Sequence, residues 1–289
     1  MQKGLTSWLT LFSSRVVSEP CVKRSNFSND HVSLGCGSNM TELRGRFHTP
    51  GYPSPYPSDT DCSWLISLPH GYVVKLFITD LNIGNSIQRC FSYEGNQGSL
   101  TIYDGPSDNG SFPLLARYCG NAVPPSPKVV STGNEVFVRF KGAMRTTVRG
   151  QDGRGFFANY SVWCGGHLTA KSYRQFVHSV SFSTTEERTD DCSWLIESTE
   201  VGQKVELQFT YMSTAYDSII YNCSEDYIEV YDGPEAANYT LLGRICGQES
   251  PTPFISTGNT LFLWTSFSTW STWRRQFSFS YYLSDSSMC

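Results

Sequence analysis

The sequence predicts an all-β protein made of two tandem antiparallel β-sandwich domains, each stapled by disulfides. Three observations lead to this prediction. Four short motifs occur twice in the same order, most of the ten cysteines fall into two similar groups, and apolar and polar residues alternate along several segments. The 289 residues are enough for two domains of ordinary size, because single hydrophobic cores seldom extend beyond about 200 residues.

The internal repeat sets the domain organisation. Each landmark of the first copy recurs 125 to 130 residues later, so the two copies differ only by a few loop residues. The pairs are Asp61–Ile66 with Asp191–Ile196, Tyr103–Pro106 with Tyr231–Pro234, Cys119-Gly120 with Cys246-Gly247, and Ser131–Asn134 with Ser256–Asn259. A period of this length corresponds to a whole domain rather than a solenoid unit. We therefore place an N-terminal segment at residues 1–35, a first domain at 36–163 and a second domain at 164–289.

Eight cysteines divide equally between the two copies. Four cysteines allow three connectivities, and sequential pairing gives both copies closed loops of similar length, from 23 to 29 residues. Sequential pairing predicts the disulfides Cys36–Cys62, Cys90–Cys119, Cys164–Cys192 and Cys223–Cys246. Cys21 and Cys289 lie outside both copies, and they could bridge to each other, pair with other segments or stay free.

The cysteine content also indicates the compartment. Ten cysteines in a chain with only 17% charged residues are typical of an oxidising environment, so we expect a secreted protein or one on the extracellular face of the plasma membrane. Neighbouring cysteines lie 15 or more residues apart, which excludes the usual spacing of zinc ligands. Sequons predict glycosylation at Asn26, Asn39, Asn109, Asn159 and Asn238, whereas the sequon at Asn222 contains Cys223, whose disulfide would compete with glycosyl transfer.

Charge argues against a nucleic acid ligand, and hydropathy argues against a membrane span. The net charge of −4 provides no basic field, so we expect no nucleic acid ligand. No apolar run approaches the roughly 20 residues of a membrane span.

The segment Met1–Phe12 has one lysine and a short mixed apolar stretch, which could be a poor signal peptide or the remnant of one. We expect the N-terminal segment to be partly disordered.

The strands are predicted from apolar and polar residues that alternate with a period of two. Apolar residues alternate with polar ones at Val205, Leu207 and Phe209, and the matching positions of the first copy are Val74, Leu76 and Ile78. The closing strands should direct Phe156, Ala158 and Tyr160, and Phe277, Phe279 and Tyr281, into the two cores, which leaves Asn159 outward and accessible. Asp-Gly and Gly-Asn turns separate the strands, and we expect Trp64 and Trp194 in the cores.

These motifs resemble the CUB domain, a jelly-roll-like extracellular β-sandwich. The first copy carries the family pattern nearly complete, in Gly45–Pro57, Cys62–Ile66, Tyr103–Gly105, Cys119-Gly120 and Gly155–Tyr160. The second copy keeps it in Cys192–Ile196, Asp226–Gly233 and Cys246-Gly247, but it lacks the opening Gly-Tyr-Pro segment. The resemblance spans residues 36 to 284 and implies a module that binds other proteins.

The resemblance also bears on calcium, which many CUB domains bind through three carboxylates. The equivalent positions are Gly84, Gly98 and Ala143 in the first copy, and Ala215, Asp226 and Ser266 in the second. Only Asp226 is a carboxylate, and Asp217 and Glu225 are near it in sequence. We therefore expect no cofactor, and we keep Asp226 and Asp217 as the only candidate calcium ligands.

An aromatic and basic stretch, Trp264–Arg275, occupies the end of the second copy where calcium is bound in the family. Trp264 falls in a predicted strand, and we expect it to face the core. Trp270, Trp273, Arg274 and Arg275 fall in a predicted loop, and we take them as binding residues because Trp and Arg are enriched at binding hot spots. The alternative is that these side chains fold back onto their own sandwich.

The sequence predicts no enzyme. It has no nucleophile elbow, no zinc-protease helix motif and no phosphate loop, and its five histidines fall in presumptive loops. A pair of acids brought together by the fold, as in a glycosidase, is the enzyme hypothesis left, and a filled interior would argue against it. We predict a non-catalytic extracellular module that binds a protein ligand through its loops. The alternatives are the ectodomain of a larger receptor and an accessory region of an extracellular protease or its enhancer.

Overall fold

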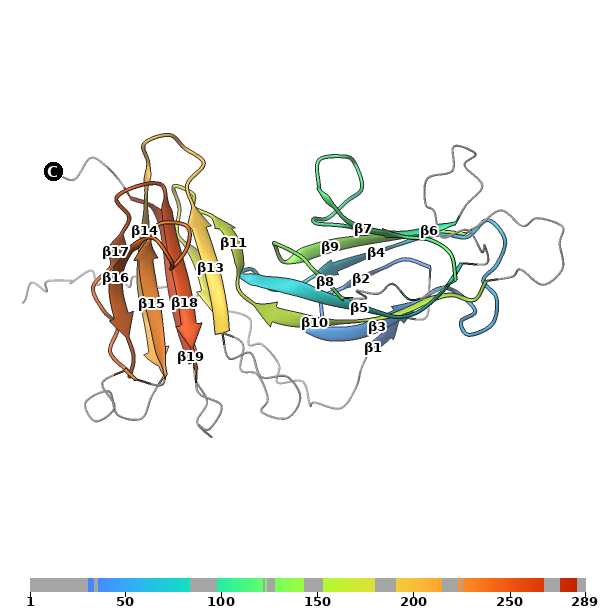
Figure 1. The fold of residues 1–289 in the computed structure, drawn as a ribbon, viewed down its shortest axis with the longest axis horizontal. Helices are drawn as coiled ribbons and strands as arrows, with labels where there is room; N and C mark the ends of the chain where they lie inside the picture. Colours follow the sequence, from blue (N-terminus) through green and yellow to red (C-terminus); the bar gives the residue numbers. More distant parts are fainter. Residues whose placement is uncertain are drawn as a thin grey trace, which may run out of the picture.

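The computed structural model describes residues 31–33, 36–83, 98–121, 123, 128–142, 153–179, 191–214, 223–224, 226–267 and 276–284. These residues form β-strands joined by turns, and they contain no helix. Among them there is accordingly no helix long and apolar enough to cross a membrane. The strands group into two sandwiches, which we call domain 1, up to Cys164, and domain 2, from Gly166 onwards (Figure 1).

Domain 1 consists of two facing sheets. Its strands are β1 (His31–Ser33), β2 (Ser38–Met40), β3 (Arg44–His48), β4 (Asp61–Ser67), β5 (Tyr72–Asn82), β6 (Ser99–Tyr103), β7 (Leu114–Tyr118), β8 (Lys128–Val130), β9 (Glu135–Lys141) and β10 (Gly155–Cys164). Sheet A has the order β1-β3-β10-β5-β8, and sheet B has the order β2-β4-β9-β6-β7. Strand β1 lies within the predicted N-terminal segment, so that segment is not disordered throughout.

Domain 2 repeats this plan. Its strands are β11 (Gly166–Thr169), β12 (Gln175–His178), β13 (Asp191–Glu197), β14 (Lys204–Ser213), β15 (Tyr227–Asp232), β16 (Thr240–Ile245), β17 (Phe254–Ile255), β18 (Thr260–Ser266) and β19 (Gln276–Ser284). Sheet C has the order β11-β13-β18-β15-β16, and sheet D has the order β12-β19-β14-β17. The described strands pair antiparallel in both domains, except that the short strands β1, β2 and β11 pair in parallel with β3, β4 and β13.

Alternating side chains fill the space between the sheets. Trp64 is fully buried and packs against the rings of Phe47 and Phe156, with centroids 5.4 and 5.3 Å away. Trp194 has the equivalent place in domain 2, where it packs against Phe277 and Phe279. The inward positions predicted from alternation are all buried, because a period of two puts every second side chain of a strand on the core side. The described side chains between the sheets therefore form a packed core.

Three of the disulfides expected from sequential pairing lie within the described residues. They are Cys36–Cys62, Cys164–Cys192 and Cys223–Cys246. Cys119 is also disulfide-bonded, and its predicted partner Cys90 lies outside the described residues, as do Cys21 and Cys289. Each bridge restricts the unfolded chain, which is how a disulfide is thought to stabilise a small extracellular domain, by about 2–4 kcal/mol.

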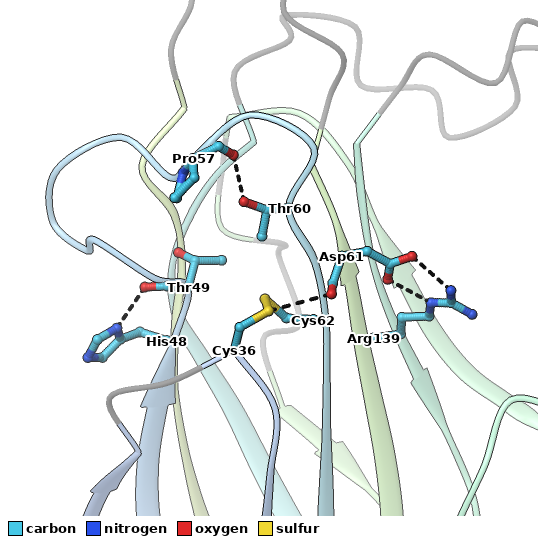
Figure 2. Close-up of a disulfide and its surroundings, with 8 residues drawn as sticks. All are labelled: Cys36, His48, Thr49, Pro57, Thr60, Asp61, Cys62 and Arg139. Carbon is cyan, nitrogen blue, oxygen red and sulfur yellow. Dashed lines mark hydrogen bonds and ion pairs between the residues drawn. A yellow bond between two sulfur atoms is a disulfide. The ribbon is translucent and has the colours of Figure 1, made fainter.

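One end of domain 1 combines a disulfide with an ion pair (Figure 2). The Cys36–Cys62 bridge joins the residues just before β2 to β4, and next to it Asp61 of β4 accepts two hydrogen bonds from Arg139 of β9, at 3.0 and 2.9 Å. The Thr60 hydroxyl donates to the Pro57 carbonyl at 2.6 Å, which closes the turn before β4. Strand β4 is thus connected on one side by the disulfide near β2 and on the other side by the ion pair with β9.

A linker of one residue joins the domains. Strand β10 ends at Cys164 and β11 begins at Gly166, which leaves only Gly165 between them. Gly165 has a φ of 103°, and a Cβ atom there would lie 2.3 Å from the carbonyl oxygen of Ser193, so only glycine fits. The backbone amide of His167 donates to the carbonyl of Thr132 at 3.0 Å, which ties domain 2 to domain 1.

The turn between β4 and β5 inserts into domain 2. The indole Nε1 of Trp194 donates to the carbonyl of Gly71 at 2.6 Å, the hydroxyl of Tyr72 donates to the carbonyl of His178, and His70 is hydrogen-bonded to the Tyr281 hydroxyl. The buried apolar side chains of both sandwiches form one connected cluster through this junction. In Figure 1 the strands of domain 1 approach β11 crosswise to those of domain 2. The pair is therefore joined by packing as well as by the chain.

Candidate protein-binding face

The predicted binding residues Trp270, Trp273, Arg274 and Arg275 lie outside the described residues, which stop at Phe267 and resume at Gln276. The described residues on either side show where this segment starts and ends. Strand β18 leads into it, β19 follows it, and the ring of Phe267 packs 6.2 Å from that of Phe277 in the core. The segment 268–275 therefore begins and ends at the same end of domain 2.

Trp264 does not face the core, so the prediction for this residue is wrong. Along β18 the inward positions are Leu261, Leu263 and Thr265, which are buried, and this places Trp264 on the outer side of sheet C. There its indole meets the ring of Tyr227 edge-on, at 6.1 Å between centroids. Side-chain size suggested a core residue, but the alternation along the strand decides the orientation.

Trp264 belongs to a row of outward side chains on sheet C. The strand register places Ser193, Trp264, Glu229 and Arg244 opposite one another across four strands. The neighbouring row contains Phe262 opposite Tyr231. We call the outward side chains of Tyr227, Tyr231, Arg244, Phe262 and Trp264 the domain 2 face.

A buried carboxylate holds this face in place. Glu229 is only 2% exposed, and Arg244 donates to its Oε1 from Nε and from a terminal nitrogen at 2.8 and 2.6 Å. The hydroxyl of Tyr231 donates to the other carboxylate oxygen at 2.7 Å. Burial, followed by this hydrogen bond, raises the pKa of Tyr231 to about 12. The charge of Glu229 is therefore paired with that of Arg244, and the carboxylate restrains both Arg244 and the hydrogen-bonded Tyr231.

Arg244 is the exposed part of this arrangement. Its guanidinium carbon lies 4.2 Å from the centroid of the Tyr227 ring, and about half of its side chain is accessible to solvent. The ion pair with Glu229 raises the pKa of Arg244, so the group stays charged. Stacking on Tyr227 and two hydrogen bonds to one carboxylate oxygen of Glu229 fix this guanidinium group, so it has little rotamer freedom left to lose. Such an arrangement suits contact with another protein surface, because aromatic and Arg side chains are enriched at hot spots.

The histidines do not form a catalytic arrangement among the described residues. Four of them lie in strands and not in loops as expected: His31 in β1, His48 in β3, His167 in β11 and His178 in β12. His178 is 2.9 Å from the hydroxyl of Ser278, but no described carboxylate bonds to its ring, which a serine-hydrolase triad requires. His167 forms an exposed ion pair with Glu197 at 2.8 Å.

The described residues do not fit a calcium site. They contain no cluster of three His, Cys, Asp or Glu side chains that could hold a metal ion. Of the positions equivalent to calcium ligands in domain 2, Asp226 and Ser266 lie within the described part of the chain, and together they offer one carboxylate and one hydroxyl. Calcium takes six to eight oxygen ligands, which this pair does not provide. Asp217 and Glu225 lie outside the described residues.

The sequons differ in accessibility. Asn39, Asn109 and Asn238 are exposed, while Asn26 and Asn222 lie outside the described residues. Asn159 points outward from β10 as predicted, but it is half-buried, and its buried side-chain oxygen has no hydrogen-bond partner among the described residues. Asn159 is therefore less accessible than the alternation predicted, because neighbouring outward side chains cover a residue in the middle of a sheet.

Comparison with known proteins identifies both domains. The family model of the CUB domain matches residues 36–160 and 164–281. Human cubilin is 32% identical over 256 residues, which cover 88% of this chain and 6% of cubilin. The zinc metalloproteinase nas-39 of Caenorhabditis elegans is 33% identical over 230 residues, which cover 79% of this chain and 23% of that protein.

Among solved structures, the CUB1-EGF-CUB2 domain of human MASP-1/3 is similar, with a TM-score of 0.34 and 21% identity over 84% of this chain and 100% of that one. The chain spans less than a quarter of the length of the two curated relatives. CUB domains are extracellular modules that bind other proteins. With two matches that together cover most of its length, this chain belongs to the CUB domain family.

Proposed function

We propose that this tandem CUB pair is a non-catalytic module, secreted or on the extracellular face of the plasma membrane, that binds a protein ligand through the domain 2 face and the adjoining segment 268–275. In that segment Trp270, Trp273, Arg274 and Arg275 make contact with the ligand. The binding relies on side-chain packing and does not involve a metal ion.

The observation that carries the proposal is the fixed Arg244 guanidinium stacked on Tyr227 beside Trp264. Tyr and Trp bury a large area at low entropic cost, and the buried Glu229 removes most of the freedom of Arg244 before any ligand arrives. The segment 268–275 adds two tryptophans and two arginines directly after β18, which carries Trp264.

Affinity capture from extracellular fluid tests the proposal. The wild-type chain is compared with Tyr227→Ala/Trp264→Ala and with Trp270→Ala/Trp273→Ala. The matched control is Tyr173→Ala/Phe176→Ala, which removes two exposed aromatic side chains, 66% and 48% accessible, next to and within β12 in sheet D. Thermal unfolding of each variant checks that the fold is retained.

One or more proteins should bind the wild-type chain and the control. The same proteins should be lost with Tyr227→Ala/Trp264→Ala and with Trp270→Ala/Trp273→Ala. Recovery of the same proteins with all four chains contradicts a role for the domain 2 face. Loss with the control alone would place the contact on sheet D instead.

A second proposal concerns the whole protein. The relatives cubilin and nas-39 are much longer than this chain, which supports a pair that acts within a larger receptor or beside a protease domain. Sequencing of the full transcript separates the two cases, because a receptor predicts a membrane-spanning helix and a protease predicts a catalytic domain. A transcript with neither leaves a soluble modulator.

A further inference from the structure

Domain 1 has an outward surface of its own, on sheet A. The strand register places Arg46, Asn159, Phe77 and Lys128 opposite one another across β3, β10, β5 and β8. The next row contains Arg44, Ser161, Lys75 and Val130. We call these two rows, together with Trp163, the domain 1 face.

The domain 1 face is basic although the chain as a whole is acidic. Its two rows contain four cations, whereas the net charge of the chain is −4. The carboxylate nearest to these rows along the described part of β5 is Asp80, and Arg154 neutralises it with two hydrogen bonds, at 2.6 and 2.8 Å. Tyr52 donates a third at 2.9 Å. The rows themselves therefore carry more positive than negative charge across sheet A.

Trp163 brings two ammonium groups together. The Nζ of Lys75 lies 4.0 Å from the centroid of its ring, and the Nζ of Lys128 lies 5.8 Å from the same centroid. Lys75 is buried, whereas Lys128 is exposed and forms no ion pair with a described Asp or Glu. An exposed ammonium over an aromatic ring can pair with a carboxylate from outside and keep its contact with the ring.

A groove of about 330 Å³ begins at Trp163 and lies at the junction of the domains. Val73 and Trp163 line it from domain 1, and Leu195 lines it from domain 2. The acids beside it are already engaged, because Glu197 pairs with His167 and Asp104 accepts hydrogen bonds from Thr132. The groove thus offers apolar surface at Val73, Trp163 and Leu195 between polar lining residues, and Lys128 lies beside the Trp163 ring.

We propose that the domain 1 face and this groove bind an acidic segment of a protein partner. An apolar side chain of the segment enters the groove between Val73 and Leu195, and a carboxylate of the segment pairs with Lys128. A protein segment fits better than a sulfated polysaccharide, because a polysaccharide would leave the apolar surface of Val73, Trp163 and Leu195 unused. The groove borders the domain 2 face, because Leu195 and Ser193 lie opposite Phe262 and Trp264 in the strand register. Lys128 and the domain 1 face belong to the other sandwich, so the inference goes beyond the function proposed above.

Peptide selection tests the inference. A random peptide library displayed on phage is selected on the immobilised wild-type chain, with the Lys128→Glu variant as counter-selection. The most enriched peptide is then synthesised, and its affinity is measured by fluorescence anisotropy for the wild-type chain, Lys128→Glu, Leu195→Ala and a control, Lys204→Glu. Lys204 is an exposed lysine at the start of β14, in sheet D, and does not line the groove.

The expected peptides contain Asp or Glu next to a large apolar residue. Lys128→Glu should weaken their binding at least tenfold, Leu195→Ala should weaken it at least threefold, and Lys204→Glu should leave it unchanged. Tyr227→Ala should also bind normally, because Tyr227 lies on β15, which does not line the groove, and this result separates the inference from a contact at the domain 2 face. The inference is overturned if no peptide is enriched, if the enriched peptides lack acids, or if heparin and not the peptide shows the sensitivity to Lys128→Glu.

Discussion

Trp64 and Trp194 occupy equivalent places in the two domains but differ in one hydrogen bond. Both follow a bridged cysteine by two residues, and both are buried. The Nε1 of Trp194 donates to the carbonyl of Gly71 in the other domain, whereas the Nε1 of Trp64 is buried and has no partner among the described residues. The indole of Trp194 therefore contributes to the junction, and that of Trp64 contributes by packing alone.

This difference predicts unequal effects of the same substitution. Trp194→Phe and Trp64→Phe remove the same atoms from a core, but only Trp194→Phe also leaves the buried Gly71 carbonyl without its donor. An unsatisfied buried group costs about 1–3 kcal/mol, so Trp194→Phe should lower the free energy of unfolding by about that much more. Denaturant unfolding of both variants measures the gap, and equal losses would contradict the role given to this hydrogen bond.

At the scale of elements, strands β4 and β9 are joined by the Asp61–Arg139 ion pair. Hydrogen bonding to Arg139 lowers the pKa of Asp61, and Arg139 also pairs with Asp108, at 2.5 Å. A carboxyl group with a lowered folded-state pKa adds stability above its ordinary pKa, and this stability is lost as the pH falls through the folded-state value. The pair thus contributes at neutral pH and not in acid.

The pH dependence of an Arg139→Met variant checks this assignment. At pH 7 the variant should unfold more easily than the wild type by up to about 1 kcal/mol, which is the usual size for partly exposed pairs. The difference should shrink as Asp61 becomes protonated below its ordinary pKa near 4. A difference that persists unchanged at pH 2 would mean that Arg139 stabilises the sheet by packing and not by charge.

The sequence predicted the strands β5, β10, β14 and β19 because the alternation along them is local. The repeat, the inward positions of β10, β14 and β19, and the disulfides within the described residues all follow from spacing alone. The error at Trp264 arose because the size of the side chain was given more weight than its position in the alternating pattern of the strand. Leu261 and Leu263, at alternate positions of the same strand, already indicated that Trp264 points outward.

The candidate surfaces were less predictable because they depend on which strands become neighbours. Arg244 is separated from Glu229 by a hairpin, and nothing in either segment alone shows that they pair. The junction is similar, since Gly71 and Trp194 lie 123 residues apart and belong to different copies of the repeat. The Gly165-Gly166 step directly after Cys164 was a usable signal, because two adjacent glycines at a domain boundary indicate close approach of the backbones.

At the scale of the whole molecule, the junction makes the two domains one body. Gly71 has a φ of 88°, and a Cβ atom at this position would lie 2.6 Å from a methyl group of Val177, which is fully buried. Together with the one-residue linker, this contact leaves little room for hinge motion. A rigid pair keeps the domain 1 and domain 2 faces at a fixed separation, which lets one partner contact both.

Gly71→Val should therefore open the junction. Gly110→Val is the matched control, because Gly110 has a φ of 84° and a Cβ atom there would meet no other atom within 4 Å, so the backbone strain is similar without the clash. Small-angle X-ray scattering should show a larger maximum dimension for Gly71→Val than for the wild type and the control. Identical scattering curves for all three chains would mean that the domains are not held together by this contact.

Hydroxyl-radical footprinting of the chain, free and bound to a captured extracellular partner, tests whether the ligand covers the domain 2 face. Tyr227, Phe262 and Trp264 should be oxidised several-fold more slowly in the complex, while Tyr173 and Phe176 react at the same rate in both states. Protection of Tyr173 and Phe176 with Tyr227 and Trp264 unchanged would contradict the claim that this CUB pair binds its ligand through the domain 2 face.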